Sequence, residues 1–94
     1  EYNNTMKIYK YKLGNVVRLP KGARILHCDT QENCLHVWAL IDPDTTEFEN
    51  YDVQVIGTGH AFNPNGWEYI STVLQGSFVW HIWFKKSKDD WEFS

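Results

Sequence analysis

The pattern of hydrophobic and polar positions has a period of two along most of the chain. Alternation is clearest over residues 7–13 and 50–58, and strand-like runs cover 23–28 and 34–41. This period is typical of half-buried strands, whose successive side chains point to opposite faces. No segment of ten or more residues shows a helical stripe. We therefore predict an all-β, mainly antiparallel fold, either a small sandwich or a partly open barrel of six to seven strands.

Two hairpins follow from the turn signals between these runs. The first joins 23–28 to 34–41, and the second joins 67–75 to 77–86 with a turn at Gln75-Gly76. In the last strand one face would carry Phe78, Trp80, Ile82 and Phe84, and the other Val79, His81 and Trp83. A strand that is apolar on both faces is central in a sheet, lies at a subunit interface or lines a pocket. Within 50–58 the inward positions would be Tyr51, Val53 and Val55.

The length of 94 residues predicts a single domain. Met6 is a candidate natural start, with residues 1–5 as an added or flexible extension, and residues 87–94 form a charged tail. The chain has no apolar run near the ~18 residues of a membrane helix, and its polar start is not a signal peptide. We therefore expect a soluble, cytoplasmic protein with no membrane partner, in which Cys28 and Cys34 stay reduced.

Charge divides the chain into two parts. Residues 1–24 carry a net charge of +5, whereas residues 25–84 hold eight acidic residues and no lysine or arginine. Either the two parts attract each other across a sheet or subunit interface, or the basic part attracts an anionic ligand. Non-specific nucleic-acid binding is disfavoured, because the acidic middle would repel phosphates. Aromatic residues make up 16% of the chain, so some rings must lie near the surface.

The first hairpin contains four residues of types that bind zinc: His27, Cys28, Cys34 and His36. A three-residue turn at 30–32 would set Cys28 opposite Cys34, with His36 farther along the same face. A two-residue turn at 31–32 would instead set His27 opposite His36. Neither register turns four ligands toward one ion, because neighbouring strand residues face opposite ways. We predict no metal site here, but two buried thiols and two ordinary histidines.

A turn with two glycines, Gly57-Thr58-Gly59-His60, follows the strand at 50–58. Its glycines either allow backbone N–H groups to approach an anion or only satisfy positive φ angles. His81 is either a hydrogen-bonded core residue or part of an aromatic pocket with His60. No Gly-x-Ser-x-Gly elbow or His-Glu-x-x-His helix is found, so we predict no catalytic residue, no enzymatic activity and no cofactor. The predicted ligand-binding residues are Gly57, Thr58, Gly59, His60, Trp38, Trp80 and His81.

Six blocks within residues 6–84 together resemble a family of small phage-encoded proteins of uncharacterised activity. They are MKIYKY from Met6, LPKGARIL from Leu19, WALIDP from Trp38, VIGTGH from Val55, YISTV from Tyr69 and VWHI from Val79. The chain departs from the family pattern at Ser71, where a glycine is usual, and Trp91 falls outside it. The resemblance implies a phage accessory protein in the host cytoplasm, of a kind that often antagonises host defence.

These observations lead to one main hypothesis and two alternatives. The main one is a non-enzymatic, homo-oligomeric counter-defence protein that sequesters a small anionic ligand such as a nucleotide immune signal. Backbone N–H groups of 57–59 would hold phosphate, His60, His81 and either Trp38 or Trp80 would contact the ring, and the basic N-terminal residues would attract the ligand. The alternatives are an inhibitor that blocks a host defence enzyme with acidic residues 42–52, and a virion or morphogenesis component with an aromatic assembly interface.

Overall fold

A computed structural model describes residues 5–87, so most of the predicted N-terminal extension and charged tail (residues 1–4 and 88–94, with Trp91) lies outside the described residues. This part of the chain forms seven strands and no helix, so it contains no helix able to cross a membrane. The strands are β1 (Lys7–Lys12), β2 (Val16–Pro20), β3 (Arg24–Gln31), β4 (Cys34–Ile41), β5 (Phe48–Gly57), β6 (Glu68–Gln75) and β7 (Phe78–Lys86).

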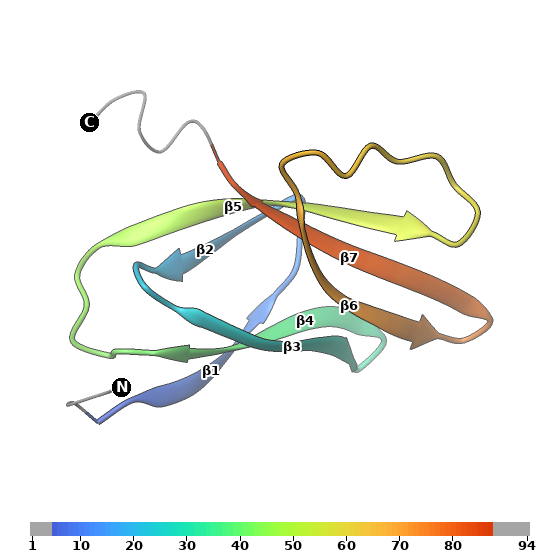
Figure 1. The fold of residues 1–94 in the computed structure, drawn as a ribbon. Coiled ribbons are helices and arrows are strands. Elements are labelled where there is room, and N and C mark those ends of the chain that lie inside the picture. The colour runs from blue at the N-terminus through green and yellow to red at the C-terminus, as the bar shows by residue number, and fades with distance from the viewer. Residues whose placement is uncertain (1–4, 88–94) are drawn as a thin grey trace.

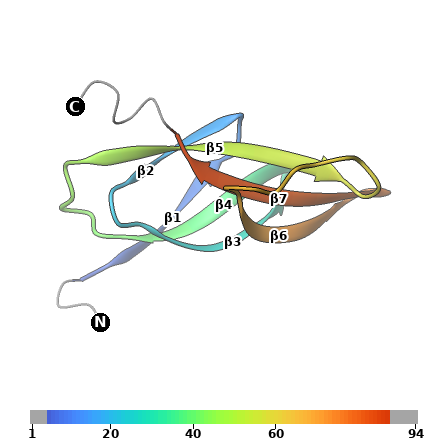
Figure 2. The ribbon, with the colours of Figure 1, turned by 45° about the horizontal axis from the view of Figure 1, so that its top comes forward.

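The strands form two antiparallel sheets that lie in two layers (Figures 1 and 2). The three-stranded sheet has the order β1-β4-β3, and the four-stranded sheet has the order β2-β5-β7-β6. The chain passes between the sheets at 13–15, 21–23 and 42–47, where glycine, proline and polar residues interrupt the alternation. The all-β prediction is confirmed. The strands form two separate sheets that do not close into a barrel.

The core lies between the sheets and takes side chains from both. Leu19, Cys28, Val37, Ile82 and Phe84 are its largest fully enclosed members. Ile82 and Phe84 alternate along β7 with His81 and Trp83, which lie on the outer face, as the period of two predicts. Strand β7 is central, because β5 pairs with one of its edges and β6 with the other. One face of β7 packs in the core, and on the other face Trp83 packs against Phe62 and Tyr69.

The alternation along β5 predicts that Val55 points inward and is buried, but 37% of its surface is exposed. It pairs with buried Ile82 on one side. On the other side, β2 follows β5 only from Phe48 to Asp52, so Val55 lies beyond the last strand neighbour there. The alternation of a strand sets which way a side chain points, but the length of the neighbouring strand decides how well it is covered.

The turn of the first hairpin differs from both predicted registers. It consists of Glu32 and Asn33, whose φ angles are 54° and 63°, the backbone of a two-residue hairpin turn. Cys34 therefore pairs with Gln31, and His36 with Asp29. The sequence carries no glycine here to mark the two left-handed positions, and glutamate is a rare occupant of them. In the second hairpin the turn is Gly76-Ser77, one residue later than predicted.

The two thiols lie on opposite faces of the three-stranded sheet. Cys28 is fully buried in the core, and burial raises the pKa of its thiol to about 11. Cys34 is half-buried and on the outer face, so the prediction of two buried thiols is wrong for this residue. The described residues contain no group of three histidine, cysteine or acidic side chains arranged to hold a metal.

This difference predicts that only one thiol reacts quickly with Ellman's reagent at pH 8. Cys34 should react at once, because a thiolate is the nucleophile and this thiol is accessible. Cys28 should react only when the domain opens, on the time scale of unfolding. Cys34→Ser should remove the fast phase and Cys28→Ser should leave it. Two fast thiols in the folded protein would contradict the buried position of Cys28.

Oppositely charged residues of the two parts of the chain do meet. Lys21 lies 3.5 Å from Glu47, with both side chains exposed, so this pair adds little stability. The acidic part also pairs with a lysine that follows both parts in the chain, since the carboxylate of Glu49 is 15% exposed and lies 2.8 Å from the Lys86 ammonium. This hydrogen bond, opposed by desolvation, holds the pKa of Glu49 below its ordinary value.

We expect Glu49→Gln to lower the free energy of unfolding by about 1–2 kcal/mol at pH 7. Because the pKa of Glu49 is lower in the folded state, its contribution is present at neutral pH and is lost as the pH falls below about 5. The difference between the variant and the unaltered chain should therefore shrink as the pH falls and vanish once the carboxyl group of Glu49 is protonated in the folded state as well. Urea unfolding at several pH values measures it, and a gap that stays constant with pH would exclude the ion pair as its cause.

Candidate ligand-binding site

A tight turn ends β5 and forms one side of the candidate site. The His60 N–H group donates a hydrogen bond to the Gly57 carbonyl oxygen at 3.1 Å. Gly59 has a φ angle of +89°, which glycine adopts without steric cost and which suits the third position of such a turn. The second glycine of the motif is thus required by the backbone of the turn.

The turn borders a shallow hollow of about 310 Å³. Gly57, Thr58 and His60 line it from the turn, and residues 77–80 line it from the start of β7. A Cβ atom at Gly57 would lie 3.5 Å from Cζ3 of Trp80 and 3.6 Å from Nε2 of His60, so both rings border this glycine. The volume is at the lower end of the range for small-molecule sites, about 300–1,000 Å³.

A pair of stacked rings forms the wall of the hollow. Phe78 and Trp80 have centroids 5.3 Å apart and planes inclined by 16°. The Trp80 Nε1–H group donates to Oε1 of Gln75 at 2.9 Å, which fixes the indole orientation. Phe78 is 60% exposed, so its ring borders solvent. Sequence reasoning left Phe78 out of the site, although its position two residues from Trp80 places both on the same face.

His81 lies on the other face of β7 and does not line this hollow. Its Nε2 atom is 2.7 Å from the Thr58 hydroxyl, and its Nδ1 atom is 3.0 Å from the Thr72 hydroxyl. The Tyr69 hydroxyl continues this chain to Thr72 at 2.5 Å. Both imidazole nitrogens are therefore engaged within the protein. His81 on β7 thus links Thr58 of the turn to Thr72 of β6.

Trp38 is the one predicted site residue in the other sheet. It lies on the outer face of β4, with the rings of His27 and His36 at centroid distances of 6.5 and 6.2 Å. The structure therefore brings together Gly57, Thr58, His60 and Trp80, with Gly59 in the same turn, and separates Trp38 from them. Of the two tryptophans predicted to contact the ring of a ligand, Trp80 lines the hollow and Trp38 does not.

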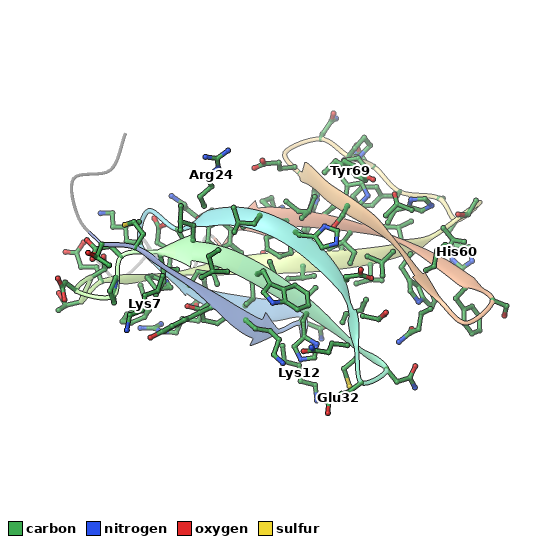
Figure 3. The ribbon with its side chains drawn as sticks, turned by 90° about the horizontal axis from the view of Figure 1, so that it is seen from below. Lys7, Lys12, Arg24, Glu32, His60 and Tyr69 are labelled. Atoms are coloured by element: carbon green, nitrogen blue, oxygen red, sulfur yellow. The ribbon has the colours of Figure 1, made fainter. Side chains whose placement is uncertain are left out.

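The hollow is lined by uncharged residues and His60, and no lysine or arginine among residues 5–87 lines it. Figure 3 shows Lys7 toward the opposite end of the molecule from His60, with Lys12 between the two in this view. The basic N-terminal part can thus attract an anion only over a distance, and contact with one would fall to His60 and the backbone of the turn.

The loop between β5 and β6 packs over Trp83 on the outer face of the four-stranded sheet. Phe62 from this loop packs on Trp83 with centroids 5.0 Å apart, and Trp67 lies 6.1 Å from Phe62. Tyr69 contacts the other side of Trp83 at 5.3 Å, and the Lys85 ammonium lies 4.7 Å from the Trp67 ring centre. These aromatic residues are thus engaged with one another within the domain.

The fold and the hollow define a two-sheet β-sandwich with a small aromatic and histidine-containing site at one end. The chain belongs to the family described as a domain of unknown function (DUF7352), which matches residues 4–92. No curated protein matches the chain, and no solved structure does either. The family description assigns no activity, so a functional conclusion has to come from the site itself.

Proposed function

We propose that the domain is a non-enzymatic binding protein for a small anionic ligand that contains a ring, of the nucleotide class. The observation that carries this proposal is that one hollow combines the Gly57–His60 turn with the stacked Phe78 and Trp80 rings. An aromatic face suits stacking on a base. Turn N–H groups and the imidazole of His60 are groups that can donate hydrogen bonds to phosphate.

The biological role we propose is that of a phage accessory protein that sequesters a nucleotide immune signal in the host cytoplasm, acting as a homo-oligomer. The resemblance to small phage-encoded proteins supports it, because the blocks from Val55 and Val79 supply the turn and Trp80 of the hollow. A shallow site of about 310 Å³ encloses only part of a nucleotide, so a second subunit that covers the ligand would strengthen binding.

Native mass spectrometry with a mixed pool of cyclic nucleotides and ADP-ribose derivatives tests the proposal, followed by calorimetry with any ligand retained. We expect a discrete mass increment, and the same spectra report the number of subunits. His60→Ala should weaken the retained ligand about tenfold or more, as expected for one charge-assisted hydrogen bond. His27→Ala, in the other sheet, is the matched control and should bind as before. No increment with any ligand would overturn the proposal.

The inhibitor alternative rests on the acidic residues 42–52, and the structure gives three of these five carboxylates a side-chain partner elsewhere in the domain. Glu47 lies beside Lys21, Glu49 beside Lys86, and Asp52 accepts a hydrogen bond of 2.7 Å from the Ser87 hydroxyl. Carboxylates that are engaged internally offer less to a basic groove on another protein. The geometry therefore favours the small-ligand proposal over the acidic mimic.

A further inference from the structure

The outer face of the β1-β4-β3 sheet carries a second group of residues that the proposed site does not use. The register sets its side chains in rows across the three strands. The opposite faces of the same strands hold Cys28, Val37 and Ala39 in the core, so these rows point outward. From β1 through β4 to β3 the rows are Ile8, Leu40 and Arg24, then Lys10, Trp38 and His27, then Lys12, His36 and Asp29.

Trp38 lies at the centre of this face. It occupies the middle strand, and the tilted rings of His27 and His36 lie beside it at 6.5 and 6.2 Å. Its neighbours on this face are Lys10 and His27 on the adjacent strands and His36 and Leu40 along β4, so two of the four are imidazoles. Trp38 is half-buried, so the indole presents part of its ring to solvent between the two imidazoles, and a planar base can stack on such a surface.

The charges on this face are mainly positive. Lys10, Lys12 and Arg24 carry three positive charges against the one negative charge of Asp29, which His27 contacts at 3.5 Å. Lys10 also donates a hydrogen bond to Gln31 on the far strand, so its ammonium group lies over the sheet. Of the acidic residues that argue against nucleic acid in the sequence, Glu49, Asp52 and Glu68 lie in the other sheet, whereas Glu32 lies in the turn between β3 and β4 at the end of this face. Folding thus places part of the acidic middle of the chain in a different sheet from Lys10, Lys12 and Arg24.

No described segment covers this face, which Figure 3 shows turned toward the viewer. Ile8 is 58% exposed at its edge. The outer face of the four-stranded sheet differs, because Phe62 packs on Trp83 there and the Thr58 hydroxyl and the His81 imidazole are hydrogen-bonded to each other. The loop between β5 and β6 thus packs on part of one aromatic face, and no described loop packs on the other.

We propose that this open face binds single-stranded nucleic acid, with Trp38 stacking on a base and Lys10, Lys12 and Arg24 contacting phosphates. Positive charge alone would suit any polyanion, and the central indole is what favours a strand with unpaired bases. The proposal is independent of the hollow at Gly57 and His60, which lies on the other sheet. It also predicts that sequence preference is weak, because every base offers a ring face.

Fluorescence anisotropy with a labelled dT12 oligonucleotide, measured over a range of salt concentrations, tests the charge contribution. With three phosphate contacts the slope of log K against log salt should be about −2, since each contact on a single strand contributes about −0.7. Lys10→Gln with Lys12→Gln should reduce the slope to about −0.7. Lys21→Gln, beside Glu47 in the loop after β2, is the matched control and should leave it unchanged. No binding at low salt, or a slope that the double variant leaves unaltered, would overturn the proposal.

An abasic oligonucleotide of the same length tests the stacking contribution, because it keeps the phosphates and lacks the bases. We expect it to bind about tenfold more weakly than dT12, and dT12 alone to quench the Trp38 fluorescence. Trp38→Phe retains an aromatic ring and should retain much of the affinity, whereas Trp38→Ala should bind dT12 and the abasic strand alike. Equal binding of both strands by the unaltered chain, or of vesicles of anionic lipid as tightly as dT12, would overturn nucleic acid as the partner. His60→Ala should bind dT12 normally, which separates this result from failure of the small-ligand proposal.

Discussion

Phe84→Ala should lower the free energy of unfolding by about 3–5 kcal/mol, the cost of removing a buried phenyl ring and leaving a cavity. Phe84 is 2% exposed, lies on the central strand β7 and packs 6.1 Å from the ring of Tyr51. A domain of 94 residues has a total stability of about 5–14 kcal/mol, so this loss removes a large share of it. Urea unfolding followed by tryptophan fluorescence measures the change as a lower midpoint with little change in slope.

Leu74→Ala is the matched control for this prediction. It also removes a large apolar side chain from the four-stranded sheet, but Leu74 lies on the outer face of β6 and is 69% exposed. Its replacement should change stability by less than about 0.5 kcal/mol. Similar losses for the two variants would mean that the outer face of this sheet is buried in solution, as a subunit interface would bury it.

Trp80→Ala should abolish most of the binding at the hollow and also weaken the fold. The indole forms the wall of the site, so the ligand would lose a stacking contact worth about 1–3 kcal/mol, or about thirtyfold in affinity at the middle of this range. Trp80 is half-buried, and its loss also removes the hydrogen bond to Gln75 and the stack with Phe78. We expect a stability loss of about 2–3 kcal/mol, below that of a fully buried aromatic residue. Calorimetry at 15 °C, where the variant stays folded, measures the affinity.

Trp38→Ala provides the comparison, since it removes the same side chain from the outer face of the other sheet. It should leave small-ligand binding unchanged. A Trp80→Ala protein that is folded by circular dichroism and still binds with full affinity would exclude the hollow as the site. If Trp38→Ala lost the ligand instead, the binding surface would be the open face of the β1-β4-β3 sheet.

Much of the candidate site follows from local sequence. The period of two set His81 and Trp80 on opposite faces of β7, and the two glycines marked the turn after β5. The sequence offered no means of choosing between Trp38 and Trp80, because each lies in a strand-like run with histidines nearby. That choice depends on which strands share a sheet, and β4 and β7 belong to different sheets. The hairpin register was missed because its turn uses Glu32 and Asn33 at positive φ without a glycine.

By itself the sequence determined the all-β class, the direction in which most strand residues point and the positions where the chain breaks. These are local properties, since alternation and turn chemistry act over a few residues. The tertiary structure alone decided which strands pair, on which of two aromatic faces a loop packs and how the charges are distributed. Those outcomes depend on contacts between residues far apart in the chain, such as Phe62 with Trp83 and Lys86 with Glu49, which no local pattern records.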